Sequence, residues 1–218
     1  EYLQETLDQD GNIVDFSFRI PEKFNFAYDI VDRIARETPG RRAMRWCNEE
    51  GATKTFTFDD LSRESDRAAG LFQSIGIGRG DMVMLILKRH YQFWIAILGL
   101  HKIGAVAIPA TNQLQVKDLL YRFESADVKA VVCTADGDIT DHVDAAAHLY
   151  GKLQSKLIVR GTRTGWMSFD EALAAQPTFI KPAEEALPAP TDPMLLYFTS
   201  GTTGMPKMVV HDYLYPIG

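Results

Sequence analysis

The sequence predicts an α/β fold in which a layered, largely parallel β-sheet is flanked by helices and accompanied by a β-hairpin. From Asp81 onward, strand and helix patterns alternate, and four short apolar runs begin 23 to 27 residues apart. This spacing is typical of parallel strands joined by helices. The runs are residues 82–87, 105–109, 129–133 and 156–159. Of the 218 residues, 46% are hydrophobic, which is enough to bury a sizeable core.

The residues before this alternation predict two helices and the hairpin. An irregular N-terminal segment leads into a helix that Pro39-Gly40 ends. Residues 43–47 and 53–58 carry strand-forming side chains on either side of a polar turn, which predicts the β-hairpin. Residues 58–75 then repeat apolar side chains every three or four positions, and Thr57 with Asp60 can cap the start of this second helix.

Three further helices are predicted after Asp81. Residues 92–100 are apolar all round and predict a helix that is buried on both sides. Residues 116–123 present a single apolar stripe. Ser168 and Glu171 can form a capping box at the start of a short later helix.

Composition and charge exclude several classes of protein. Acidic residues outnumber basic ones by 29 to 23, and the net charge of -6 argues against nucleic acid or an anionic membrane as the main partner. Cys47 and Cys133 are isolated and lack the spacing of a zinc site or a disulfide framework. The apolar region 82–110 is interrupted by Lys88-Arg89-His90 and by His101-Lys102, so no membrane span is expected. We therefore expect a cytoplasmic protein.

One motif in the sequence carries chemistry. A strand at residues 194–198 is followed by four hydroxyl side chains, two glycines and one lysine within nine residues, and then by another strand. Glycines allow the backbone amides to approach an anion closely, hydroxyls add hydrogen bonds and a lysine adds positive charge, so this run predicts a polyphosphate cradle. The run is Thr199-Ser200-Gly201-Thr202-Thr203-Gly204-Met205-Pro206-Lys207.

Two other interpretations of this motif, a Walker A loop and an ordinary hairpin turn, are less favoured. A Walker A loop is disfavoured because only two residues separate Gly201 from Gly204 and because Pro206 precedes Lys207, which also disfavours a kinase-like phosphotransferase. An ordinary Ser/Thr/Gly hairpin turn is the simpler alternative for a short Gly-Thr-Thr-Gly segment, but the full nine-residue run favours a phosphate-binding loop.

The run resembles the phosphate-binding loop of the adenylate-forming enzymes, whose signature is a strand followed by Thr-Ser-Gly-Thr-Thr-Gly-x-Pro-Lys. Residues 55–61, 78–83 and 104–109 are similar to the N-terminal order of segments in that superfamily. Residues 108–113 and 207–211 are most similar to acetyl- and medium-chain acyl-CoA synthetases. The resemblance implies an incomplete N-terminal domain of the adenylate-forming fold.

The resemblance also implies a reaction and its participants. An AMP-forming acyl-CoA synthetase, an acid–thiol ligase of fatty acid metabolism, joins a carboxylic acid to ATP and passes the acyl group to coenzyme A, with Mg²⁺ sharing the phosphate charge. The resemblance assigns the ATP phosphates to seven residues, of which Lys207 is also the catalytic candidate: Thr199, Ser200, Gly201, Thr202, Thr203, Gly204 and Lys207. Gln113 is placed near the acyl or CoA channel, at the end of a predicted strand.

The resemblance further implies that parts of the active site lie outside these residues. The glutamate that binds Mg²⁺, the aspartate that binds the ribose and the C-terminal lysine are absent from the sequence, so no metal ligand is assigned here. The chain has no initiator Met and stops soon after Lys207. We therefore expect the N-terminal portion of a longer chain, inactive without its missing remainder.

The sequence also predicts a division of the chain. Five prolines fall in residues 177–193 and predict an extended connector. Residues 1–176 are then an N-terminal α/β subdomain, and residues 194–218 are a truncated strand, phosphate loop and strand that begin the next subdomain. Two alternatives to the synthetase stay open at this point: a stand-alone nucleotide-binding or regulatory domain, and an adenylation enzyme with an acceptor other than CoA.

Overall fold

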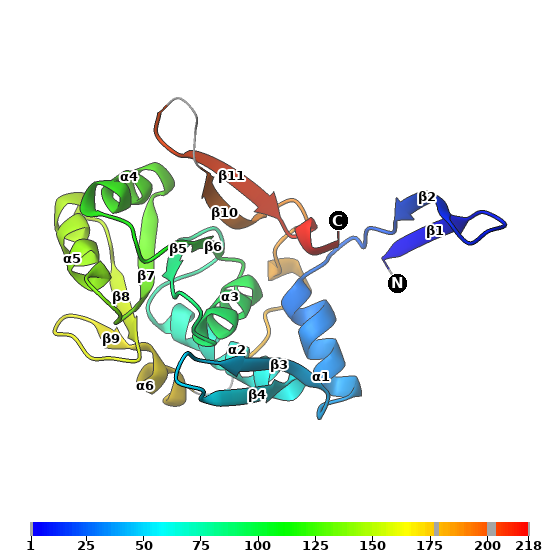
Figure 1. The fold of residues 1–218 in the computed structure, drawn as a ribbon, viewed down its shortest axis with the longest axis horizontal. Helices are drawn as coiled ribbons and strands as arrows, with labels where there is room; N and C mark the ends of the chain where they lie inside the picture. Colours follow the sequence, from blue (N-terminus) through cyan, green and yellow to red (C-terminus); the bar gives the residue numbers. More distant parts are fainter. Residues whose placement is uncertain (1, 177–178, 200–203, 218) are drawn as a thin grey trace.

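The computed structural model describes residues 2–176, 179–199 and 204–217. Its centre is a seven-stranded sheet with the strand order β11-β10-β6-β5-β7-β8-β9 (Figure 1). Neighbouring strands from β10 to β9 pair in parallel, and only β11 is antiparallel to its neighbour. The predicted α/β fold with a largely parallel sheet is therefore confirmed. The strands are β5 (Met82–Ile86), β6 (Val106–Pro109), β7 (Val128–Thr134), β8 (Ser155–Val159), β9 (Met167–Ser168), β10 (Pro193–Thr199) and β11 (Lys207–Asp212).

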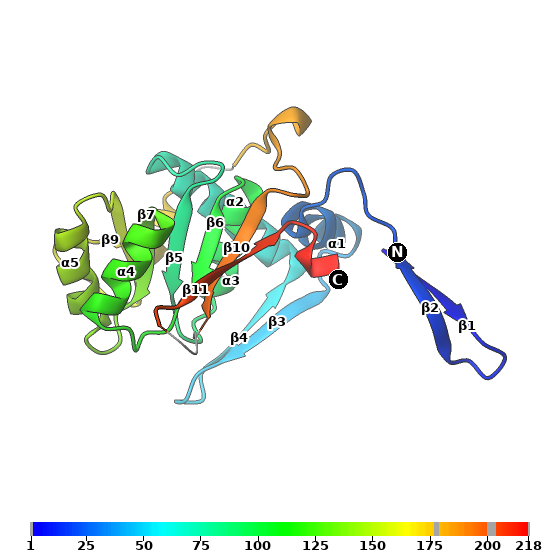
Figure 2. The same cartoon turned by 90° about the horizontal axis from the view of Figure 1, so that it is seen from above.

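Helices cover both faces of this sheet (Figures 1 and 2). One face packs against α2 and α3, the other against α4 and α5. Within β5, Val83 and Leu85 belong to the first core cluster, whereas Met84 and Ile86 belong to the second. Alternate side chains of a strand point to opposite faces, which explains why the central strands are continuous apolar runs. The helices are α1 (Arg33–Glu37), α2 (Phe58–Ser74), α3 (Gln92–Lys102), α4 (Val116–Ala126), α5 (Ile139–Tyr150) and α6 (Phe169–Ala174).

The helix boundaries follow local signals that the sequence contains. Thr57 and Asp60 form the predicted capping box at the start of α2, and the Ser168 hydroxyl accepts a hydrogen bond from the Glu171 amide at the start of α6. The first predicted helix is a π-helical segment, Ala27–Asp32, continued by α1. The predicted hairpin at residues 43–58 forms as β3 (Arg42–Cys47) and β4 (Thr53–Thr57).

The prediction of an irregular N-terminal segment is wrong. Residues Leu3–Leu7 (β1) and Ile13–Phe18 (β2) form an antiparallel hairpin that stands away from the sheet (Figures 1 and 2). Its turn is held by the Asp8 carboxylate, which accepts hydrogen bonds from the amides of Asp10 and Asn12. All residues of both strands are exposed, so no buried face imposed the alternation that identifies a strand.

The last two strands follow a connector that the structure describes from residue 179 onward. The Lys23 ammonium donates a hydrogen bond to the Glu184 carbonyl at 2.6 Å and fastens this connector to the N-terminal part of the chain. β10 then enters the same sheet beside β6, with Leu195 opposite Ala107. The division into residues 1–176, 177–193 and 194–218 stays a prediction, and β10 is continuous with the larger sheet.

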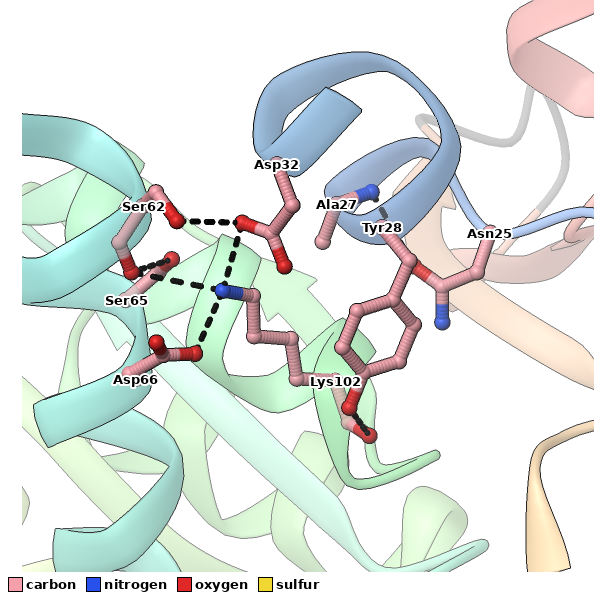
Figure 3. A network of polar contacts seen from close by, with 8 residues as sticks. All are labelled: Asn25, Ala27, Tyr28, Asp32, Ser62, Ser65, Asp66 and Lys102. Carbon is pink, nitrogen blue, oxygen red and sulfur yellow. Dashed lines mark hydrogen bonds and ion pairs between the residues drawn. The ribbon is translucent and has the colours of Figure 1, made fainter. Parts of the chain in front are cut away.

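A buried lysine joins three helical segments on one face of the sheet (Figure 3). The side chain of Lys102, at the end of α3, is fully buried, and its ammonium lies 2.8 Å from Asp32 and 2.6 Å from Asp66. The Tyr28 hydroxyl donates to the Lys102 carbonyl at 2.9 Å. Burial raises the pKa of the Asp66 carboxyl, and Lys102 opposes that rise. The N-terminal helix, α2 and α3 therefore share one ion-pair network.

We predict that Lys102→Met lowers the free energy of unfolding by about 3 kcal/mol, because two partly buried carboxylates lose their cation. Chemical denaturation measures this change. Lys88→Met is the matched control, because Lys88 pairs with Asp136 at an exposed position, where loss of the pair is expected to cost less than about 1 kcal/mol. Equal effects of the two substitutions would contradict the role given to the buried pair.

The same variant is predicted to depend on pH. A carboxyl whose pKa is raised by folding favours the folded state at low pH, and this contribution is lost as pH rises through the folded-state pKa. Without the Lys102 cation the pKa of Asp66 rises further, so protonation relieves the buried charge more easily. The stability deficit of Lys102→Met should therefore shrink between about pH 7 and about pH 4. A stability deficit that grows as the pH falls from about 7 to about 4 would contradict this role of the Asp66 carboxyl.

Candidate active site

The parallel strands bring their carboxyl ends to one edge of the sheet. β10, β6, β5, β7 and β8 all run in the same direction, so the segments that follow Thr199 and Pro109 leave the sheet at the same edge. In open α/β sheets this is the edge at which ligands bind. Two of the predicted site segments, the phosphate loop and the Gln113 loop, therefore begin on neighbouring strands.

The two ends of the predicted phosphate loop face each other. β10 and β11 pair antiparallel with Thr199 opposite Lys207, and the Thr199 hydroxyl donates a hydrogen bond to the Lys207 carbonyl at 3.4 Å. Both residues are exposed. Within residues 2–176, 179–199 and 204–217, the Lys207 ammonium has no ion pair or hydrogen bond. The backbones of Thr199 and Lys207 are thus held side by side where the loop begins and ends.

The remaining loop residues are described only in part. Ser200, Gly201, Thr202 and Thr203 lie outside the described residues. Gly204 is exposed, and a Cβ added to it would meet no atom within 4 Å. Packing within the described chain therefore does not require glycine at position 204. A glycine at this position is consistent with the close approach of a ligand to the backbone.

Helix α4 contacts both flanks of the loop (Figure 1). The Tyr121 hydroxyl donates to the Pro206 carbonyl at 2.9 Å, and the Tyr121 ring meets the Phe198 ring edge-on with 6.2 Å between centroids. The Arg122 guanidinium lies over the same Phe198 ring at 5.0 Å, where burial lowers its pKa. The sequence did not single out Tyr121 or Arg122, because both lie beside the apolar stripe of α4 and no motif marks them.

Aromatic packing holds the far end of the hairpin. The His211 ring stacks on Tyr215 with 4.0 Å between centroids and meets Tyr197 at 5.7 Å. Burial raises the pKa of Tyr197, and the neighbouring Tyr215 raises it further. These contacts of His211 are those of a packing residue.

Gln113 lies in the loop that follows β6 and is exposed. Its amide N–H donates to the Thr111 hydroxyl at 3.3 Å, and its carbonyl accepts from the Gln115 side chain at 3.5 Å. Its own side-chain amide makes no hydrogen bond to the described part of the chain. The structure thus places Gln113 at the predicted edge of the sheet, without a contact to Thr199 or Lys207.

In the part of the chain that the structure describes, no group of three or more His, Cys, Asp or Glu side chains could hold a metal ion. The same residues include no helix that is long and apolar enough to cross a membrane.

Comparison with known proteins decides the family. A family model described as "AMP-binding enzyme" matches residues 31–215. The chain belongs to the AMP-binding enzyme family. This membership confirms the resemblance to adenylate-forming enzymes that the sequence motif indicated.

Curated members of the AMP-binding family are similar to most of this chain. The mitochondrial acyl-coenzyme A synthetase ACSM5 of Rattus norvegicus is 40% identical over 201 residues, which are 88% of this chain and 34% of that protein. The mitochondrial acyl-coenzyme A synthetase ACSM3 of Mus musculus is 35% identical over 91% of this chain and 35% of its own length. The chain therefore spans about a third of the length of the curated relatives that it matches.

Solved structures of the AMP-binding family share the fold. The Brucella canis acyl-CoA synthetase superposes with a TM-score of 0.75 at 24% identity, covering 88% of this chain and 34% of that one. The anthranilate CoA ligase AuaEII, solved with anthranoyl-AMP, gives a TM-score of 0.75 at 21% identity, with 89% of this chain and 36% of that one covered. The expected N-terminal portion of the adenylate-forming fold is confirmed.

The names of the two curated relatives state a cellular compartment. Both synthetases above are named as mitochondrial proteins, whereas the sequence predicted a cytoplasmic one. The cytoplasmic location therefore stays a prediction for this chain.

Proposed function

We propose that this chain is the phosphate-binding portion of an ATP-dependent, AMP-forming acyl-CoA synthetase. The observation that carries the proposal is the pairing of Thr199 with Lys207 at the carboxyl end of β10, at the two ends of the nine-residue run. The names of the two curated relatives above, both acyl-coenzyme A synthetases, support the same reaction. Its substrates are then a carboxylic acid, ATP and coenzyme A.

The first half-reaction activates the carboxylate. A carboxylate oxygen attacks the α-phosphorus of ATP, a new oxygen–phosphorus bond forms, and the bond to the bridging oxygen of pyrophosphate breaks with its electron pair. Negative charge therefore grows on the departing pyrophosphate. Fixed hydrogen-bond donors and cations next to it stabilise the transition state more than the ground state. We assign this role to the Lys207 ammonium and to the hydroxyls and amides of residues 199–204.

The second half-reaction transfers the acyl group. The thiolate of coenzyme A attacks the acyl carbon of the adenylate, a thioester forms and AMP leaves. Gln113 is our candidate for contact with the acyl or CoA channel, because its unengaged side-chain amide lies at the same edge of the sheet as the phosphate loop. No residue of the described chain is assigned to the α-phosphate or to the ribose.

Mg²⁺ is expected to accompany ATP in this reaction. The described residues contain no group of three or more His, Cys, Asp or Glu side chains that could hold a metal ion, so none of them is assigned to Mg²⁺. We propose that the remaining ligands belong to sequence beyond this chain, and that the chain by itself has no significant adenylating activity.

The proposed reaction predicts a distinct set of products. In the complete polypeptide that carries this chain, a panel of carboxylic acids with ATP, Mg²⁺ and coenzyme A should release pyrophosphate and AMP with at least one acid. AMP release that needs an acid but proceeds without any thioester would favour a non-CoA acceptor. Nucleotide binding with no turnover of any acid would favour a regulatory domain.

Lys207→Ala is predicted to slow pyrophosphate release by about tenfold to a thousandfold, the effect of losing one preorganised donor. The matched control is Lys152→Ala, which removes the same charge from an exposed residue paired with Asp127 at 3.6 Å. The control should keep the wild-type rate. Equal rates for wild type and Lys207→Ala would refute the role of the phosphate loop.

Gln113→Ala is predicted to separate the two half-reactions. If the amide contacts coenzyme A, the KM for coenzyme A should rise about fivefold, as expected for one hydrogen bond of about 1 kcal/mol. The rate of pyrophosphate release in the absence of coenzyme A should not change. A slower first half-reaction with an unchanged KM for coenzyme A would contradict a contact with coenzyme A and favour the acyl channel, and no change in either would contradict both.

A further inference from the structure

The phosphate loop lies on a hairpin whose second strand, β11, has little packing of its own. β11 is the terminal strand of the sheet and pairs only with β10. Its first four residues, Lys207 to Val210, are all exposed. An edge strand without buried side chains opens locally more easily than the core of a sheet. The position of the Lys207 ammonium therefore depends on contacts from outside the hairpin.

Tyr121 supplies such contacts to both strands at once. Its hydroxyl donates to the carbonyl of Pro206, the residue before Lys207, at 2.9 Å. Its ring packs edge-on against Phe198, the residue before Thr199. The Arg122 guanidinium covers the same Phe198 ring at 5.0 Å. One side of one helical turn thus touches the residue that precedes each end of the Thr199–Lys207 pair.

The helix that carries Tyr121 is firmly anchored. Leu119 and Phe123 of α4 are fully buried in the core cluster beneath the sheet. Gln115 and Asp118 form a capping box at its first turn. The Arg122 guanidinium also donates to the Asp118 carbonyl at 2.8 Å, which holds it against its own helix. A well-packed helix therefore presents Tyr121 to the exposed edge strand of the sheet.

We propose that Tyr121 is a positioning residue for the adenylation step, with Arg122 supporting the same contact. It sets the place of the Lys207 ammonium and the Thr199 hydroxyl before ATP binds. This inference rests on the proposed function of the phosphate loop. Preorganised donors lower a barrier only while they hold their place, and small displacements of such groups reduce rates strongly.

Tyr121→Phe tests the hydrogen bond while it keeps the ring. In the complete polypeptide, kcat for pyrophosphate release should fall about threefold to tenfold, while the melting temperature falls by no more than about 3 °C. Hydrogen–deuterium exchange of residues 207–212 should be faster than in wild type. Tyr121→Leu, which also removes the ring contact with Phe198, should lower kcat further.

Tyr150→Phe is the matched control for this experiment. The Tyr150 hydroxyl also donates a single hydrogen bond, to Asp127 at 2.9 Å, at the end of α5 beside the amino ends of the strands. The substitution removes the same chemical group from a comparable contact. It should leave both kcat and the exchange of residues 207–212 unchanged.

The outcomes separate this inference from the proposed function. If Lys207→Ala slows pyrophosphate release and Tyr121→Phe does not, the positioning role of Tyr121 is overturned and the phosphate loop stands. If Tyr121→Phe lowers only the melting temperature, its role is structural and the inference is again overturned. If Lys207→Ala has no effect either, the proposed function of the loop has failed, and the positioning role fails with it.

Discussion

The common direction of the strands from β10 to β9 is the constraint on which the rest of the structure depends. Both faces of the central strands are buried under helices, so polar groups can appear only where a strand ends. Parallel pairing sends all of these ends to the same edge. Thr199 ends β10 and Lys207 begins β11, and the place of Thr199 at that edge results from the pairing of Leu195 with Ala107.

Sequence patterns predicted what local rules control. The central strands appeared as apolar runs because they are buried on both faces, and α2 was marked by the Thr57–Asp60 capping box. The two strands that flank the nine-residue run were also expected, whereas their antiparallel pairing, with Thr199 opposite Lys207, is known only from the structure. The β1–β2 hairpin escaped prediction because its strands are wholly exposed and its turn depends on the Asp8 side chain.

Contacts between distant residues were beyond these patterns. In the sequence, Lys102 was noted only because it interrupts the apolar region 82–110. In the structure its ammonium is fully buried between Asp32 and Asp66, which lie 70 and 36 residues away. The spacing of apolar residues predicts which side of a helix is buried, but it does not predict which carboxylates contact a lysine on that side. A buried cation needs such partners, so their presence could be expected but their identity could not.

Tyr121 shows the same limit at the candidate site. It lies beside the stripe that anchors α4, and its partner Pro206 is 85 residues away. Its hydroxyl contacts Pro206, the residue before β11, and its ring contacts Phe198 in β10. Since both contacts come from one side chain on a buried helix, a shift of either strand disturbs the other contact. Helix α4 therefore ties Phe198 and Pro206 to the core through Tyr121, with Arg122 supporting the contact at Phe198.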